Sequence, residues 1–344
     1  MKMKKVICFG ELMIRYNPPG YERFVQTDTM VFNFGGAEAN VSVSLANYGI
    51  DSSFVTKLPA HEIGQAAVNI MRKYGVDTTG IVRGGDRVGI YYVEKGASQR
   101  ASKVIYDRKY SAIAMADRAD FDWNRIFDGA DWFHFTGITP ALGDNVAEIC
   151  LDACKAAKEM NVPISCDLNF RKNLWTSEKA GKVMGELMQY VDLCIANEED
   201  ADMVFGIKAD NTDVDAGVLN HEGYVSVAKQ LADRFGCGKV AFTLRTSYSA
   251  NDNDWAGMLY DSKTGETAFS RTYSVHIVDR VGGGDSFGGG LIYSQLNNAS
   301  LQDSIEFAVA ASALKHSIEG DFNFMSLAEV NALLKGGGSG RVQR

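Results

Sequence analysis

The most informative run of residues in this 344-residue chain is Val278-Asp279-Arg280-Val281-Gly282-Gly283-Gly284-Asp285-Ser286-Phe287-Gly288-Gly289-Gly290. Its first three glycines, 282–284, lead directly into a segment with helical periodicity. Glycine leaves backbone N–H groups unhindered, and a helix N-terminus carries partial positive charge. The turn therefore predicts an anion site, for which phosphate is the natural occupant.

Asp285 falls in the first turn of that predicted helix. A carboxylate beside a phosphate site is a poor choice for binding an anion, but it is well suited to deprotonate a hydroxyl group that attacks the phosphate. We interpret Asp285 as a general base. The alternative is that Asp285 only caps the helix, as aspartate often does, and the residue alone does not decide between the two.

Two common nucleotide motifs do not fit the sequence. No G-x-x-x-x-G-K-[ST] segment is present, which excludes the P-loop route to nucleotide binding. The glycine run also lacks the βαβ spacing and the acidic residue of a dinucleotide fingerprint, which disfavours a hydride-transfer enzyme.

Outside the glycine run, short apolar stretches alternate with segments of helical period. This pattern predicts a doubly wound, mostly parallel α/β sheet with helices on both faces. Strands are expected at 5–10, 54–58, 132–136, 162–167, 192–196 and 239–244. Helices are expected at 37–48, 63–74, 145–159, 178–190 and 224–235, with three more after Asp285.

Two extended polar-aromatic segments, at about 12–34 and 88–112, interrupt this alternation. We expect their strands to leave the main sheet and form a small β-strand flap, or lid, that excludes water from a site. Peripheral hairpins are the alternative. We expect one domain over 1–335, a flexible Gly/Ser-rich tail at 336–344, and a homodimer through the lid strands, because such strands often pair.

The net charge of the chain limits which kinds of partner are expected, and its cysteines indicate the cell compartment. The chain has 35 Lys and Arg against 43 Asp and Glu, a formal charge of -8, which disfavours nucleic acid and anionic membrane as partners. No apolar run approaches membrane-spanning length, and the six cysteines form no C-x-x-C pair, so we expect reduced thiols in a cytoplasmic protein. An anionic substrate would need specific cations inside a pocket.

Three separated motifs together resemble one family. These are Gly35-Gly36 with Asn40, Asn197-Glu198-Glu199-Asp200 at a predicted strand end, and the run 279–285. In this order and spacing they resemble the ribokinase-type (PfkB) family of sugar kinases over nearly the whole chain. Within that family, the segments 18–24, 34–40, 167–171 and 320–323 look most like kinases of 2-keto-3-deoxygluconate.

The resemblance implies a ribokinase-like fold, ATP and Mg²⁺ as cofactors, and phosphorylation of the terminal hydroxyl of 2-keto-3-deoxy-D-gluconate to 2-keto-3-deoxy-6-phosphogluconate. It implies that Asp285 is the base, and that Gly282, Gly283 and Gly284 stabilise the transferring phosphoryl group with their N–H groups. Both roles agree with the reading of the glycine run itself.

Substrate contacts implied by the resemblance are Gly35, Gly36, Asn40, Tyr91, Tyr106, Arg108, Arg171 and Asp321. The two glycines are expected to lie against the sugar, where a side chain would collide, and Asn40 either reaches the sugar or caps locally. Arg108, with Tyr106, and Arg171 are expected at the substrate's carboxylate and hydroxyls, because arginine binds a carboxylate through two N–H groups.

The implied nucleotide contacts are Asn197, Thr243, Arg245, Gly282 and Gly284. Water-bound magnesium is expected near Asp200, which stands where the family has glutamate, or near the adjacent Glu199. All five histidines are expected to be structural.

Two other functions remain open from the sequence. One is a kinase of a neutral sugar such as fructose or ribose. The other is a sugar-binding protein without turnover, against which the intact run 282–285 argues. The sequence does not distinguish the gluconate from the galactonate epimer.

Overall fold

The computed structural model describes residues 3–208 and 221–337, so most of the expected tail at 336–344 lies outside the described residues. Its main sheet has ten strands in these residues, in the order β13-β12-β11-β10-β9-β8-β1-β4-β5, with β14 paired to β12. The parallel strands are β1 (Lys5–Phe9), β4 (Asp51–Leu58), β5 (Ile81–Arg83), β8 (Trp132–Thr136), β9 (Ile164–Asp167), β10 (Leu193–Ala196) and β11 (Lys239–Ser247). Antiparallel pairing at one edge adds β12 (Asp252–Asp261), β13 (Thr267–Phe269) and β14 (Tyr273–His276).

The sheet is buried on both faces. Along β1, Ile7 and Phe9 belong to one apolar cluster, whereas Val6 and Cys8 belong to another. Side chains alternate across a strand, so the two clusters lie on opposite faces of the sheet. This explains why the parallel strands read as continuous apolar runs in the sequence.

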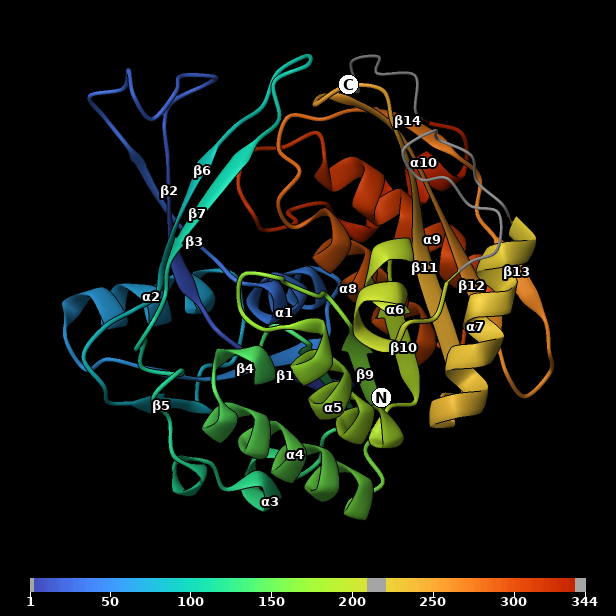
Figure 1. Ribbon diagram of the computed structural model, residues 1–344, viewed down its shortest axis with the longest axis horizontal. Coiled ribbons are helices and arrows are strands. Elements are labelled where there is room, and N and C mark those ends of the chain that lie inside the picture. The colour runs from blue at the N-terminus through green and yellow to red at the C-terminus, as the bar shows by residue number, and fades with distance from the viewer. Residues whose placement is uncertain (1–2, 209–220, 338–344) are drawn as a thin grey trace.

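Helices cover both faces (Figure 1). One face carries α3 (Trp123–Ile126), α4 (Asp144–Glu159), α5 (Ser177–Leu187), α6 (Glu198–Phe205) and α7 (His221–Phe235). The other carries α1 (Ala37–Asn47), α2 (Glu62–Lys73), α8 (Gly283–Leu296) and α9 (Leu301–Lys315), with α10 (Leu327–Leu334) packed on α9. Short 3₁₀ turns are η1 (Arg118–Asp120), η2 (Pro140–Leu142) and η3 (Met188–Tyr190).

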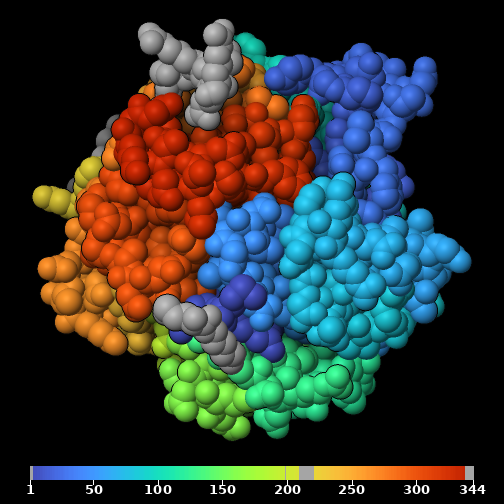
Figure 2. Space-filling view, turned by 180° about the vertical axis from the view of Figure 1, so that it is seen from behind, coloured from blue at the N-terminus to red at the C-terminus, as the bar shows by residue number. Residues whose placement is uncertain are grey.

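A separate sheet of four strands projects from the body at the upper left of Figure 1 and the upper right of Figure 2. Its strands are β2 (Met13–Asn17), β3 (Val31–Gly35), β6 (Ile90–Glu94) and β7 (Lys103–Asp107), in the order β3-β2-β6-β7. The two hairpins are joined by parallel pairing of β2 with β6, in which Arg15 lies opposite Tyr91. The two expected segments therefore form one sheet, which we call the lid; that it covers a site stays a prediction.

The fold class predicted from the sequence is confirmed, and each predicted strand and helix is present with ends shifted by at most three residues. The predicted helix 178–190 finishes as the 3₁₀ turn η3. The strands β12 to β14 were not predicted, because residues 247–254 are rich in Ser, Asp and Asn, which are typical of turns. In the described part of the chain, no helix has the length and apolar character needed to span a membrane.

Candidate active site

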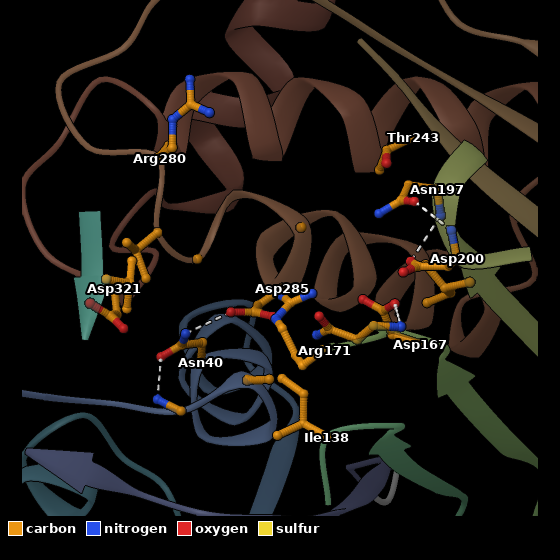
Figure 3. Close-up of a pocket in the computed structure, with 18 of the residues that line it drawn as sticks. Asn40, Ile138, Asp167, Arg171, Asn197, Asp200, Thr243, Arg280, Asp285 and Asp321 are labelled. Carbon is orange, nitrogen blue, oxygen red and sulfur yellow. Dashed lines mark hydrogen bonds between the residues drawn. The ribbon is translucent and has the colours of Figure 1, made fainter. Parts of the chain in front are cut away.

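A cavity of about 430 Å³ lies at the carboxyl ends of the central parallel strands (Figure 3). Asp167 ends β9, Asn197 follows β10, and Thr243 of β11 lies one residue beyond the last pairing with β10; all three line the cavity. The lid contributes Tyr91 and Tyr106, and the N-terminus of α8 contributes Asp285. In open α/β sheets this edge is where ligands bind, because loops from several strands converge there.

The glycine turn at the start of α8 is built tightly. Gly282 is the N-cap, with φ 82° and ψ 0°, and a Cβ there would overlap the carbonyl oxygen of Asp321. A Cβ on Gly283 would lie 2.6 Å from the ring of His316. Around Gly284, by contrast, no atom lies within 4 Å of a built Cβ, although this residue lines the cavity. Packing within the protein thus explains why residues 282 and 283 are glycines, but it does not explain the glycine at 284.

Asp285 is held at the cavity wall by Asn40 from α1. The Asn40 Nδ2 donates to Asp285 Oδ2 at 2.6 Å, and Asn40 Oδ1 accepts from the backbone N–H of Gly36 at 3.4 Å. Loss of hydration raises the pKa of Asp285 to about 7, and the hydrogen bond from Asn40 opposes the shift. A carboxylate with this pKa accepts and releases a proton near neutrality, as a general base must.

Close packing against protein atoms explains Gly35 and Gly36, which we expected to lie against a sugar. A Cβ on Gly36 would overlap the carbonyl oxygen of Glu11, and one on Gly35 would overlap the carboxylate of Asp321 and lie 2.6 Å from the Tyr91 hydroxyl. Gly36 lines the cavity, whereas Gly35 lies behind its wall. Any contact of this pair with a ligand therefore comes from Gly36.

Three aspartates face one arginine across the cavity. Arg171 lies among Asp285, Asp167 and Asp200 in Figure 3, and its charge lowers the pKa of each of them. Burial outweighs this effect, so the pKa of Asp200 rises to about 6 and that of Asp167 rises well above its usual value. Arg171 is thus the local counter-charge of the carboxylates before any ligand binds.

Asn197 and Asp200 form the N-terminal cap of α6. The Asn197 side chain accepts hydrogen bonds from the N–H groups of Glu199 and Asp200, both at 2.9 Å, and Asp200 Oδ2 accepts from Asn197 N at 3.3 Å. Asp200 Oδ1 accepts from Phe170 N at 2.9 Å. Asp200 lines the cavity, whereas the exposed Glu199 lines a neighbouring cleft of about 820 Å³. Within residues 3–208 and 221–337, no three His, Cys, Asp or Glu side chains are grouped to hold a metal ion.

On the lid side of the cavity, two tyrosines and an arginine stack on one another. The Tyr91 hydroxyl donates to Asp321 Oδ2, and its ring stacks on Tyr106 with centroids 6.1 Å apart. The guanidinium of Arg108 lies 5.4 Å from the Tyr106 ring centroid. Arg108 Nε donates to Glu11 Oε2 at 2.8 Å, so its charge is paired within the protein.

Arg280, just before the glycine turn, and Arg245 of β11 line the same cavity as Trp255 and His316. Burial, followed by the neighbouring charge of Arg245, lowers the pKa of Arg280. His316 is neutral, because burial lowers its pKa to about 4. Two arginines in the cavity that the N-terminus of α8 also lines would suit a ligand with several phosphates.

A family model described as pfkB family carbohydrate kinase matches residues 3–323. The chain belongs to this family. Its fold is the ribokinase-like α/β fold, and its activity is that of a sugar kinase, as the motif resemblance predicts.

Individual relatives of this kinase have related names. A 2-dehydro-3-deoxygalactonokinase of Haloferax volcanii is 30% identical over 338 residues, which cover 98% of both chains. A 2-dehydro-3-deoxygluconokinase of Bacillus subtilis is 23% identical, over 94% of this chain and 93% of its own. The crystal structure of a 2-dehydro-3-deoxygluconokinase from Thermotoga maritima superposes with a TM-score of 0.93 at 50% identity, covering 96% of this chain and 99% of that one.

Most site residues predicted for this carbohydrate kinase line the cavity of about 430 Å³. The exceptions are Gly35, Gly283 and Glu199, which do not line it. Cavity residues that sequence reasoning missed include Asp167, Asn253, Trp255, Arg280 and His316. Asp167 could have been found from the sequence, because it ends a predicted parallel strand, and ligands bind at such strand ends. Trp255 and Asn253 could not have been, since they lie on the unpredicted strand β12.

Proposed function

We propose that this kinase transfers the γ-phosphoryl group of ATP to the terminal hydroxyl of 2-keto-3-deoxygluconate (2-dehydro-3-deoxygluconate), giving 2-keto-3-deoxy-6-phosphogluconate. The observation that carries the proposal is Asp285, a carboxylate of pKa about 7 in the first turn of α8 beside Gly282 and Gly284. The name of the Thermotoga maritima structure, at 50% identity, supports this substrate.

In the proposed reaction, Asp285 takes the proton from the sugar hydroxyl as its oxygen attacks the γ-phosphorus. The bond between that phosphorus and the β–γ bridging oxygen breaks, and ADP leaves. Backbone N–H groups of the glycine turn stabilise the charge on the transferred group, and most of the rate enhancement comes from positioning and charge stabilisation. Asn40 orients the carboxylate through its 2.6 Å hydrogen bond.

ATP and Mg²⁺ fit the residues at the other end of the cavity. We propose that Thr243, Arg245 and Asn197 contact the nucleotide, because they line the cavity on the side of β10 and β11. Both carboxylate oxygens of Asp200 already accept backbone hydrogen bonds. Asp200 would therefore reach magnesium through water, and the ion would neutralise phosphate charge when bound.

For the carboxylate of the substrate, we propose Arg108 and Arg171. Arg108 contacts Glu11 Oε2 through Nε at 2.8 Å and through Nη2 at 2.5 Å, which leaves the donors on Nη1 for a ligand. Its pairing with Glu11 fixes the guanidinium plane before binding, so little side-chain entropy is lost. Tyr106 supports the same group from its ring face.

The decisive experiment measures ADP release with Mg·ATP across 2-keto-3-deoxygluconate, its galactonate epimer, fructose, ribose and gluconate, with Asp285→Ala in parallel. We expect turnover of the keto-deoxy acids and a loss of several orders of magnitude in the variant, with ATP binding retained. Near-normal turnover of Asp285→Ala would remove it as the base. If the wild-type enzyme releases no ADP with any of these sugars, the proposed substrate is overturned.

A second test concerns the carboxylate. Arg108→Ala should raise KM for the acid sugar by roughly 100-fold and that for a neutral sugar far less, because a charged hydrogen-bonded pair is lost only with the acid. Arg87→Ala is the matched control, since Arg87 pairs with Asp107 at the protein surface. Equal effects on acid and neutral sugars would show that Arg108 holds no carboxylate.

The galactonate epimer is the second candidate substrate, because the Haloferax volcanii relative is named a 2-dehydro-3-deoxygalactonokinase. The two acids share the carboxylate and the terminal hydroxyl, so the same roles of Asp285 and Arg108 serve either. The ratio of kcat/KM for the two epimers in the panel decides between them.

We also propose that the kinase forms a homodimer through its lid strands. Among the described residues, no strand pairs with the outer edge of β3 or of β7, and Val31, Phe32, Val104 and Ile105 on them are exposed. Exposed apolar strand edges are ready pairing surfaces. A monomeric mass in light scattering at micromolar concentration would contradict this assembly.

A further inference from the structure

A buried ion cluster joins the lid to the glycine turn. Arg15 of β2 is fully buried, with 0% of its side chain exposed. Its Nη1 donates to Asp321 Oδ1 and its Nη2 to Asp279 Oδ2, both at 2.6 Å. The two carboxylates lie on different loops, so a single guanidinium bridges three segments of the chain.

Both partners of Arg15 shape the turn at the start of α8. Asp279 Oδ1 accepts from the N–H of Val281 at 3.1 Å, which folds the residues just before Gly282. The carbonyl oxygen of Asp321 lies where a Cβ on Gly282 would be, so the two backbones are in close contact. A displacement of either carboxylate would therefore move the N–H groups that face the cavity.

The same cluster reaches the lid face of the cavity. Tyr91 lies opposite Arg15 in the β2–β6 register, and its hydroxyl donates to Asp321 Oδ2. Asp321 therefore accepts from two neighbouring lid strands at once, one through each carboxylate oxygen. Tyr91 lines the cavity and stacks on Tyr106, so the position of the lid aromatics depends on Asp321.

A second buried cation contacts the same two loops. Lys315 of α9, also fully buried, donates from Nζ to the carbonyl oxygens of Asp279 at 3.2 Å and Gly320 at 2.6 Å. Four dehydrated charges are an inefficient source of stability, because the cost of desolvation cancels most of the attraction. Such a cluster instead specifies geometry, because the attraction offsets the cost of desolvation only when the guanidinium and the two carboxylates keep these positions.

We propose that Arg15 is a positioning residue for phosphoryl transfer: it fixes the lid against the glycine turn, so that the sugar-facing tyrosines and the phosphate-facing N–H groups keep one relative position. Arg15 itself does not line the cavity. The inference rests on the proposed function in taking Tyr91 and Tyr106 to face the sugar and the N–H groups of the glycine turn to face phosphate.

The test compares Arg15→Lys with Arg87→Lys, an arginine beside the lid that pairs with Asp107 at the surface. Lysine keeps the charge but offers one nitrogen, which cannot span two carboxylates held by separate nitrogens. In the unliganded protein, we expect amide hydrogen exchange to accelerate together in residues 279–284 and in β6, with α4 unchanged. With the sugar that the panel identifies, kcat should fall roughly 10- to 100-fold, as misplacement of reacting groups does.

Asp321→Asn is the second variant. It keeps the side-chain volume and an oxygen acceptor for Tyr91, but it removes the charge that faces Arg15. We expect the same paired acceleration of amide exchange. Added guanidinium, at a concentration that does not denature, should partly restore kcat to Arg15→Ala, a recovery that general loosening of the fold would not show.

Unchanged exchange at 279–284 in both variants, or a kcat within twofold of wild type, would overturn the assignment. Failure of both variants to fold would also overturn it, because the cluster would then serve the fold and not the site. If no sugar in the panel is phosphorylated, the proposed substrate fails, whereas the exchange experiment, which needs no substrate, still decides the role of Arg15.

Discussion

At the scale of single residues, the role that we propose for Asp285 depends on what surrounds its carboxylate. In water an aspartate is ionised far below neutral pH, and such a weak base is inefficient at removing a proton from a sugar hydroxyl. Here the wall of the cavity raises the pKa of Asp285 to about 7, while Asn40 holds one oxygen in place. Environment, and not residue type, thus gives this carboxylate a pKa suited to the general base that we propose.

The pH dependence of the rate follows from that shift. Asp285 acts only when ionised, so kcat/KM for the sugar should rise with pH through an inflection near 7 and then level off. Because the Asn40 hydrogen bond lowers the pKa of Asp285, Asn40→Ala should move the inflection to higher pH, besides lowering the plateau. Initial rates across the neutral range measure both, and an inflection near the ordinary aspartate pKa would contradict the assignment.

The glycine turn allows a matched pair of substitutions. Gly282→Ala should lower the free energy of unfolding by about 1–2 kcal/mol or more, because its φ of 82° is unfavourable for alanine and its Cβ overlaps Asp321. Gly284→Ala should leave stability unchanged or slightly higher, since no atom lies within 4 Å of its Cβ.

In Gly284→Ala, activity should fall although stability does not. The methyl group of Gly284→Ala would enter the part of the cavity where we propose that phosphate oxygens bind, so we expect kcat/KM to fall roughly 100-fold in a fully stable protein. Thermal melting and steady-state kinetics on the same samples separate the two effects. Normal kinetics in Gly284→Ala would show that the phosphoryl group does not approach this residue.

At the scale of elements, the start of α6 serves both folding and the site. Asn197 caps the helix and lines the cavity. Asn197→Ala should therefore cost about 1 kcal/mol of stability, the usual effect of losing an N-cap, and should weaken nucleotide binding as well.

Asn197→Asp separates these two roles. Aspartate caps a helix as well as asparagine does, so stability should be retained. It would add a negative charge beside Asp200 and Asp167, so KM for ATP should rise by roughly tenfold or more. Chemical denaturation and ATP titration of both variants check this prediction, and unchanged KM in Asn197→Asp would place the nucleotide elsewhere.

At the scale of the whole molecule, the two-sided core determines the behaviour of the cysteines. All six are free and buried, spread over the apolar clusters on both faces of the main sheet. Burial raises the pKa of every one of these thiols, to about 12 for Cys8 and Cys237. A thiol is reactive only as thiolate, so all six are protected while the kinase is folded.

A thiol-specific chromogenic reagent at mildly alkaline pH measures this protection. We expect negligible reaction with the native protein and reaction of all six thiols in denaturant. A rapidly reacting thiol in the native state would reveal local opening of the sheet near that residue.

The order of elements and the doubly wound sheet were readable from the sequence, and Asp285 could be proposed there as a base, because all three depend on local signals. Alternation of apolar runs with helical periods records burial on two faces, and Gly282 to Asp285 are contiguous in the chain. Strands β12 to β14 were missed, because their polar start resembles a turn until β11 supplies a partner.

Only the tertiary structure decided which distant residues meet. Asn40 and Asp285 are 245 positions apart, and Arg15 and Asp321 are 306 apart, so no local pattern links either pair. The pairing of Arg108 with Glu11 and the gathering of three aspartates around Arg171 arise in the same way. A sequence specifies its elements through short-range periodicity, but charge pairing and pKa depend on distance and dehydration in space, which exist only once the sheet and the lid have assembled.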